Sequence, residues 1–229
     1  MALYAIGDLH LSLGSNKPME VFGERWTDYV ARIGSAFSEL QEDDVIVLAG
    51  DTSWGISLEE ALPDFRFLDA LPGKKLLLKG NHDYWWGTAS KMKTFFAANG
   101  ITGLDILHNN CFFYGDYAIC GSRGWFYEED AAGTHTGKMI AREVLRLEAS
   151  FAAAGEKKIL CFLHYPPLYH GYQCPELLEA IDRNNVERCY YGHLHGPTHR
   201  RAFEGKRNHT DYALISADFL EFLPKKICE

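Results

Sequence analysis

The chain has 229 residues, of which 47% are hydrophobic and 24% charged, so we expect a single globular domain over residues 1–229. A formal net charge of −8 argues against binding to nucleic acid or anionic membrane through a basic surface. The sequence has no apolar run of the roughly 18 residues that a membrane span needs, and its first residues lead us to expect no signal peptide. We therefore expect a cytoplasmic protein.

Short apolar runs alternate along the chain with longer amphipathic stretches, which is typical of an α/β fold. Five of the runs have the length and composition of buried strands. They are Leu3–Ile6, Val45–Ala49, Lys75–Lys79, Lys158–Leu163 and Arg188–Tyr191.

Between these runs, apolar residues recur at three- and four-residue steps, which predicts helices that pack one face on a core. The expected helices cover Glu24–Leu40, Leu58–Leu71, 88–100, 139–155 and a short stretch from Pro175 through Ile181.

Two further segments predict antiparallel strand pairs. Cys111–Tyr114 and Tyr117–Cys120 flank a Gly-Asp pair that is typical of a hairpin turn. Near the end of the chain, Asp211–Ser216 and Phe219–Phe222 have the pattern of a second pair. The sequence thus predicts antiparallel strands added to a parallel centre.

Each of the five expected strands runs into a polar cluster. The clusters are Gly7-Asp8-Leu9-His10, Gly50-Asp51, Gly80-Asn81-His82-Asp83, His164-Tyr165-Pro166 and Gly192-His193-Leu194-His195. Ligands bind beyond the carboxyl ends of the strands in open α/β sheets, so we expect the clusters to converge. In an extended chain, donors two residues apart project to the same side, which would direct Leu9 and Leu194 into the core.

The clusters contain two carboxylates, four imidazoles and one amide. These are Asp8, Asp51, His10, His164, His193, His195 and Asn81. This mixture suits manganese, iron or zinc better than magnesium or calcium. Seven donors exceed the needs of one tetrahedral ion, so we expect two divalent transition-metal ions that share a carboxylate. Taken singly, the D-x-H motif is typical of a surface turn and the G-H-x-H motif fits a mononuclear site.

The complete set resembles the calcineurin-like metallophosphoesterases, whose pattern of D-x-H, G-D, G-N-H-[DE], a later His and G-H-x-H spans Asp8 to His195. The resemblance implies an α/β (α+β) fold: a four-layer αββα sandwich with two mixed β-sheets flanked by helices. It also implies two metal sites that share Asp51. The first would be held by Asp8, His10, Asp51 and His195. The second would be held by Asn81, His164, His193 and the shared Asp51.

The implied activity is that of a dinuclear phosphohydrolase, which cleaves a phosphomonoester or phosphodiester by attack of a metal-bridging hydroxide. His82 is expected to face the substrate and protonate the leaving oxygen or stabilise the transition state, the alternative being that it only orients ligands. Asp83 is expected to fix the position of a neighbouring histidine. The protein-phosphatase pattern G-D-x-x-D-R-G is absent after Gly50, so the chain is more similar to small bacterial phosphohydrolases.

Aromatic residues surround the motifs and are candidates for substrate binding. They include Trp54, Trp85, Trp86 and Tyr165, together with Trp125–Tyr127. Such rings could stack on a nucleobase, or they could simply pack the loops. Arg123 could bind a phosphate oxygen or form a surface salt bridge. We expect the substrate to be a small phosphate ester, for which a nucleotide is one candidate.

Two other functions are compatible with the motifs. A nuclease of the same fold would need a basic groove, and the acidic composition argues against it. A non-catalytic scaffold that keeps the fold would tend to lose metal ligands, and this chain retains all seven.

Overall fold

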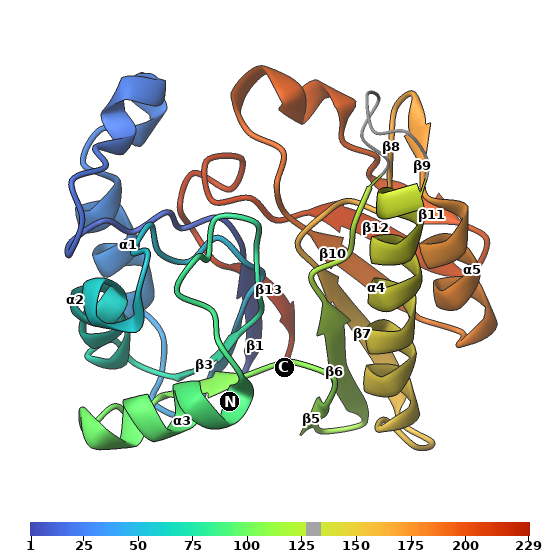
Figure 1. Ribbon diagram of the computed structural model, residues 1–229, viewed down its shortest axis with the longest axis horizontal. Helices are drawn as coiled ribbons and strands as arrows, with labels where there is room; N and C mark the ends of the chain where they lie inside the picture. Colours follow the sequence, from blue (N-terminus) through green and yellow to red (C-terminus); the bar gives the residue numbers. More distant parts are fainter. Residues whose placement is uncertain (127–133) are drawn as a thin grey trace. The chain divides into compact units, whose positions relative to one another are not determined.

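The structure is a computed structural model of the 229-residue chain and describes residues 1–126 and 134–229. It divides into two compact units, the first formed by Met1–Ile106 with Ile215–Glu229 and the second by Leu107–Leu214 (Figure 1). The single domain over residues 1–229 stays a prediction. Every helix among the described residues is too short or too polar to cross a lipid bilayer.

The first unit contains a five-stranded sheet in the order β13-β1-β2-β3-β4. Strands β1 to β4 are parallel, and β13 pairs antiparallel with β1 at one edge. The bounds are Leu3–Ile6 for β1, Val45–Leu48 for β2, Lys74–Leu77 for β3, Leu104–Ile106 for β4 and Lys225–Cys228 for β13. The three expected strands of this unit are confirmed, whereas β4 and β13 were not expected.

Three helices pack on this sheet, and their apolar faces join its side chains in one core. They are α1 (Tyr29–Ser38), α2 (Leu58–Asp69) and α3 (Ala89–Ala98). The side chain of Ser57 caps α2 by accepting from the Glu60 N–H, and that of Thr88 caps α3 in the same way.

Helix α1 is shorter than the sequence pattern predicts. It begins at Tyr29 because Asp28 has a left-handed backbone with φ of 52°, which a continuous right-handed helix cannot contain. The apolar stripe upstream belongs instead to two short 3₁₀ helices, η1 (Met19–Phe22) and η2 (Glu24–Trp26).

The second unit contains a six-stranded sheet in the order β11-β12-β10-β7-β6-β5. Its four central strands are parallel, and the edge strands β5 and β11 are antiparallel to their neighbours. The bounds are Cys111–Tyr114 for β5, Tyr117–Ser122 for β6, Lys158–Leu163 for β7, Arg188–Tyr191 for β10, Gly205–Arg207 for β11 and Thr210–Leu214 for β12. The predicted β5–β6 hairpin is confirmed.

Helices α4 (Thr134–Ala152) and α5 (Pro175–Arg183) lie side by side along this sheet (Figure 1). A small hairpin of β8 (Leu168–Tyr169) and β9 (Tyr172–Gln173) follows β7, and the 3₁₀ helix η3 (Gly196–Arg201) follows β10. Both insertions begin at the carboxyl ends of central strands.

Of the second predicted pair of strands, near the end of the chain, one strand is confirmed as β12 and the other is wrong. Residues Phe219–Phe222 form turns rather than a strand, with the Phe222 N–H donating to the carbonyl of Ala217. Glu221 and Phe222 both have positive φ, at 53° and 64°, which no strand residue adopts. The short apolar segment resembles a strand in sequence, but a turn buries Phe222 in the core.

The predicted fold class is confirmed, because each unit has one mixed sheet flanked by helices. Antiparallel strands lie at the edges of the parallel strands in both sheets, as the sequence indicates.

Candidate metal centre

Polar loops follow three parallel strands of the first unit where those strands end. Strands β1, β2 and β3 pair in register, so their carboxyl ends lie at the same edge of the sheet. Asp8 follows β1, Asp51 follows β2 and Asn81 follows β3. This edge is where ligands bind in sheets of this kind. The structure thus brings the predicted metal ligands of this unit to one edge.

The loop backbones reach this arrangement by left-handed turns rather than by an extended chain. Asp8, His10 and Asp51 have φ values of 59°, 49° and 50°. Such values are uncommon for residues with a side chain, and they concentrate at functional sites. The expectation of an extended D-x-H segment is therefore wrong, although Leu9 between the two donors is buried as expected.

Donor atoms of Asp8, His10 and Asp51 lie close together below the surface. Nε2 of His10 is 3.8 Å from Oδ2 of Asp51. A carboxylate oxygen of Asp8 lies within 4.8 Å of a ring nitrogen of His10 and of a carboxylate oxygen of Asp51. The residues are 0%, 3% and 1% exposed, respectively.

This donor set fits a divalent cation. Two buried carboxylates at this separation repel each other unless a cation or a proton offsets their charge. Carboxylate and imidazole together are ligands that borderline transition metals prefer. Asp8, His10 and Asp51 could therefore hold a metal ion, and the ion would remove the repulsion between the two carboxylates.

Asp83 holds the loop that carries Asp51. Its carboxylate accepts hydrogen bonds from the backbone N–H groups of Gly80, Asp51, Thr52 and Ser53, at 2.7 to 3.3 Å, and from the Trp85 indole at 3.1 Å. It is fully buried. The sequence predicts that Asp83 positions a neighbouring histidine. The five hydrogen-bond donors described here are four backbone N–H groups and an indole, not histidine side chains. A carboxylate with this many backbone donors fixes the path of the loop.

Gly80 allows the loops after β2 and β3 to approach closely. A Cβ at this position would overlap the Asp51 carboxylate, so a side chain would push the two loops apart. The next contact along the chain joins the same loops, since the His82 N–H donates to Oδ1 of Asp51 at 2.7 Å. Only glycine fits this position of the G-N-H-D motif.

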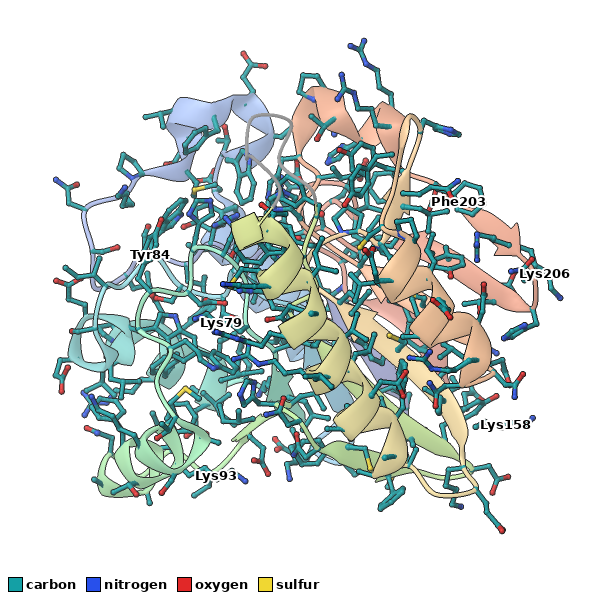
Figure 2. The ribbon with its side chains drawn as sticks, turned by 45° about the vertical axis from the view of Figure 1, so that its right-hand side comes forward. Lys79, Tyr84, Lys93, Lys158, Phe203 and Lys206 are labelled. Atoms are coloured by element: carbon teal, nitrogen blue, oxygen red, sulfur yellow. The ribbon has the colours of Figure 1, made fainter. Side chains whose placement is uncertain are left out.

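The imidazole of His82 lies among other rings at the half-exposed edge of this unit. Its centroid is 4.5 Å from that of Trp54 and 5.8 Å from that of His10. Its Nδ1 is 3.2 Å from the hydroxyl of Tyr84, which is itself 58% exposed (Figure 2). His82 thus lies beside the buried donors with access to solvent, as a group that acts on a substrate requires.

The second unit presents three predicted ligands at the ends of two neighbouring parallel strands. His164 follows β7, and His193 and His195 follow β10. The rings of His164 and His193 have centroids 5.2 Å apart, and His164 is fully buried. His193 has a left-handed backbone with φ of 73°, so the H-x-H segment is not extended either. Leu194 is buried, as expected.

His195 is the N-cap residue that precedes η3. Its backbone N–H donates to the Thr198 hydroxyl at 2.9 Å, and this hydroxyl in turn donates to the His195 carbonyl. A ring nitrogen of His199 lies within 4.8 Å of one of His195. His199 belongs to none of the motifs, and its signal in the sequence is its place four residues after a motif histidine.

The structure supports different roles for the candidate aromatic residues. Trp54 stacks on His10 with centroids 5.0 Å apart and is half-exposed, so it can contact a ligand. Trp85 is only 4% exposed and packs on Phe65, and Trp86 packs on Trp85. The burial of Trp85 and the packing of the half-exposed Trp86 on it favour the loop-packing alternative over substrate contact.

In the second unit, Tyr165 lies between the predicted ligands and the residues after β6. Its ring centroid is 4.5 Å from that of His193 and 4.9 Å from that of Phe126. Tyr127, the next aromatic candidate, lies outside the described residues. Tyr165 is 7% exposed, so it supports the imidazole of His193 more than it contacts solvent.

Arg123 has protein partners, in a salt bridge that is largely buried rather than at the surface. Its guanidinium lies 3.6 Å from the buried Glu143 carboxylate and 4.4 Å from the centre of the Trp125 ring. Burial lowers the pKa of Arg123, and the nearby Glu143 opposes this effect. These contacts favour a structural role over phosphate binding.

Comparisons with known proteins place this geometry in context. No curated protein matches the chain. A solved protein of unknown function from Aquifex aeolicus, AQ665, is 15% identical and has a TM-score of 0.55, with 98% of this chain and 95% of that one covered. The phosphopantetheinyl hydrolase PptH from Mycobacterium tuberculosis is 14% identical with a TM-score of 0.62, and 99% and 95% are covered. At these identities the two structures share the fold.

The family model of the calcineurin-like phosphoesterases matches residues 1–197, which include all the predicted motifs. The family uses divalent metal ions, and the first-unit donors fit such an ion. The chain therefore belongs to the calcineurin-like phosphoesterases and is a metal-dependent hydrolase.

Proposed function

We propose that the protein is a dinuclear phosphoesterase that hydrolyses a phosphomonoester or a phosphodiester. The observation that carries this proposal is the buried cluster of Asp8, His10 and Asp51 in the first unit. A pair of buried carboxylates beside an imidazole is costly to maintain without a cation, and a catalytic metal accounts for its presence.

Within this proposal, the metal ligands come from both units. Asp8, His10 and Asp51 would hold the first ion together with His195. Asn81, His164 and His193 would hold the second, with Asp51 shared between the two. The identity of the donors favours manganese, iron or zinc. That the two groups of ligands meet around one pair of ions is part of the proposal.

When bound, two such ions supply a hydrolytic nucleophile near neutral pH and offset the negative charge of a phosphoryl group. The chain must then help the leaving group depart. His82 is suited to this role, because it is half-exposed beside the buried donors and Tyr84 contacts its Nδ1. We propose that His82 gives a proton to the leaving oxygen from its other ring nitrogen, Nε2.

Asp83 supports this chemistry indirectly. By binding four backbone N–H groups, it fixes the loop of Asp51 and the turn that presents His82. A shift of about 1 Å in such a loop can reduce turnover a hundredfold. We propose a positioning role for Asp83 rather than direct contact with the substrate.

We also propose that the enzyme acts in the cytoplasm on a small phosphate ester. All six cysteines are free thiols, as is usual in a reducing compartment.

The decisive experiment is reconstitution of the purified metal-free protein with manganese, iron or zinc, followed by elemental analysis and an activity screen. The screen compares a generic aryl monoester, a generic aryl diester, cyclic nucleotides, dinucleoside polyphosphates and a phosphopeptide. We expect about two equivalents of metal and metal-dependent hydrolysis of at least one ester. Bound metal without any hydrolysis would favour a scaffold, and cleavage of nucleic acid alone would favour a nuclease.

A further inference from the structure

Four of the six cysteines lie side by side across the sheet of the second unit. Cys111 on β5 lies directly opposite Cys120 on β6. Cys161 on β7 and Cys189 on β10 continue the same row on the next two strands. Residues directly opposite each other on neighbouring strands project to the same face of a sheet, so the four thiols form one row. The chemistry proposed above uses none of them.

The pair at the edge of this row has the backbone geometry that a disulfide requires. A two-residue turn joins β5 to β6, so Tyr114 and Tyr117 form the hydrogen-bonded pair that closes the hairpin. Hydrogen-bonded and non-hydrogen-bonded pairs alternate along an antiparallel ladder, which makes Cys111 and Cys120, three pairs further on, a non-hydrogen-bonded pair. The Cα atoms of such a pair are about 4.5 Å apart, a separation that a disulfide can bridge.

The two thiols interact with each other and with the end of the helix that covers them. Sγ of Cys111 donates to the Ala153 carbonyl at 3.1 Å, and Sγ of Cys120 donates to the Ser150 carbonyl at 3.3 Å. Both carbonyls belong to the C-terminal end of α4 and the residue after it, where a helix lacks N–H groups for its last carbonyls. The thiols thus cap this end of α4, which lies along β6 (Figure 1).

The two partners differ in their access to solvent. Cys111 is half-exposed on the edge strand β5, whereas Cys120 is fully buried behind it. Cys161 and Cys189 are fully buried as well. A small oxidant therefore meets Cys111 first, and Cys120 is the thiol that lies opposite the oxidised sulfur.

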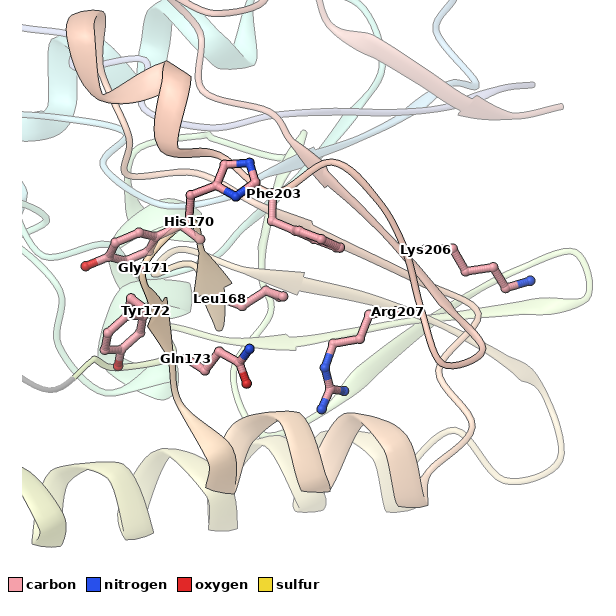
Figure 3. A pocket seen from close by; sticks show the side chains of 9 residues that line it. Leu168, His170, Gly171, Tyr172, Gln173, Phe203, Lys206 and Arg207 are labelled. Atoms are coloured by element: carbon pink, nitrogen blue, oxygen red, sulfur yellow. The ribbon is translucent and has the colours of Figure 1, made fainter.

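Cys174 in the same unit lacks both features. It follows Gln173, which Figure 3 shows where the β8–β9 hairpin leads into helix α5. Cys174 is fully buried, and its Sγ donates to the carboxylate of Glu176 at 3.6 Å. A carboxylate rather than a second thiol is its neighbour, so it provides no partner for a disulfide.

We propose that Cys111 and Cys120 form a site of reversible oxidation, at which hydrogen peroxide converts the two thiols into a cross-strand disulfide. The sulfur of Cys111 attacks the peroxide, so that an S–O bond forms, the O–O bond breaks and one water leaves. The sulfur of Cys120 then displaces the hydroxyl group of this sulfenic acid as a second water, and the S–S bond forms. In total the thiols lose two electrons and two protons, and the peroxide is reduced to two waters.

The surroundings of the pair set the rate and the structural consequence of this reaction. Burial raises the pKa of Cys111, and it raises that of Cys120 to about 12, so the reactive thiolates are scarce near neutral pH and the disulfide forms slowly. A disulfide has no S–H group, so oxidation removes the donors that cap the end of α4. We expect the last turn of α4 to exchange its amide hydrogens faster in the oxidised protein.

The test exposes the purified protein to hydrogen peroxide in a zinc-containing buffer, because zinc has no redox chemistry of its own. Chymotrypsin, which cleaves at the aromatic residues between Cys111 and Cys120, is applied without reductant before mass spectrometry. We expect the peptides of these two cysteines to be linked, two of the six thiols to be lost, and dithiothreitol to restore both. The disulfide should form about tenfold faster for each pH unit between pH 7 and 8.

Three variants separate the pair from the other thiols. Cys111→Ser should leave Cys120 reduced, and Cys120→Ala should oxidise at Cys111 without forming a disulfide. The control is Cys228→Ser, a half-exposed cysteine of the first unit, and it should form the disulfide like the unmodified protein.

Linkage of Cys111 to a different cysteine, oxidation of Cys111 to an acid in the unmodified protein without linkage, or equal loss of thiols in Cys111→Ser would each overturn the inference. Hydrogen exchange of the reduced and the oxidised protein measures the effect on α4. A linked pair with unchanged exchange in the last turn of α4 would contradict its capping by the two thiols.

Discussion

The two units contribute chemically different halves to the predicted metal centre. The first unit presents the carboxylates of Asp8 and Asp51, and both are buried in loops tied by backbone hydrogen bonds. The second unit presents only imidazoles, of which His193 and His195 are half-exposed. All the negative charge that attracts a cation therefore comes from one unit. This difference predicts that the first unit determines whether metal binds and that the second determines how tightly.

Removing charge from the first unit gives the largest expected effect. In Asp51→Asn the shared carboxylate is lost, so we expect both ions to be lost and turnover to fall by about 10³-fold. Metal content by elemental analysis and hydrolysis of an aryl ester measure the two effects. The control is Asp116→Asn, whose side chain is 92% exposed. Retention of both metal and activity in the Asp51 variant would remove this residue from the centre.

His82→Ala separates metal binding from leaving-group departure. We expect unchanged metal content and about 10²-fold slower turnover of an alkyl ester, because a general acid typically contributes at least this much. An aryl ester with an acidic leaving group should be affected far less, since it departs without a proton. The exposed His209 provides the control variant His209→Ala. Equal slowing of both esters would contradict a role as proton donor.

His195→Asn tests the contribution of the second unit to metal affinity. Removal of one neutral imidazole should weaken binding of one ion by about a hundredfold while leaving the other in place, and excess metal should restore activity. A metal titration followed by activity measures this directly. His170→Asn is the control, since His170 is an exposed histidine of the same unit and belongs to no motif. Loss of both ions in the His195 variant would contradict the prediction that the second unit determines only how tightly metal binds.

Asp83→Asn probes the support of the first-unit loop. The amide replaces one acceptor oxygen by a donor that faces backbone N–H groups, so the loop of Asp51 should become less ordered. We expect metal affinity to fall about tenfold, as is typical when a group behind a ligand is changed. Asp105→Asn, in strand β4, is the control. An unchanged metal affinity would show that the loop does not depend on Asp83.

The smallest expected effect is that of Asp64 on the pH dependence of the free energy of unfolding, and it leaves turnover unchanged. Asp64 lies behind the same loop, where it accepts hydrogen bonds from the Ser53 hydroxyl and from the Leu13 N–H. Burial raises its pKa to about 6, although the Ser53 hydrogen bond opposes this. A carboxyl whose pKa is raised on folding stabilises the fold when protonated, so its contribution is lost as pH rises from about 4 through 6.

The corresponding loss is on the order of 3 kcal/mol at most, from the 1.36 kcal/mol that one pKa unit represents. Urea unfolding between pH 4 and 7 should show this decline in the unmodified protein and a smaller one in Asp64→Asn. Parallel curves for the two proteins would contradict the raised pKa.

The motifs could predict which polar side chains gather at one edge of each sheet, because the ends of parallel strands place their loops together whatever the details of the turns. That these side chains bind metal stays a prediction. The spacing of Asp8 and His10 could not reveal their left-handed backbone, which depends on contacts with the loop after β2. The hydrogen bonds from Asp83 to the loop of Asp51 could not be predicted from the sequence either, since the three N–H groups of that loop lie 30 to 32 residues away in the chain. Phe219–Phe222 was wrongly predicted as a strand because the segment is short and mostly apolar, whereas its backbone turns at Glu221 and Phe222, which both have positive φ.

The left-handed backbone at Asp8, His10 and Asp51 also opposes the stability of the metal-free protein to its activity. Asparagine tolerates this backbone region better than most residues, and at Asp8 or Asp51 it would also remove the repulsion between the two carboxylates. Selection for heat resistance of the metal-free protein should consequently enrich inactive sequences at these positions. A library sorted first for thermal survival and then for hydrolysis would reveal this opposition.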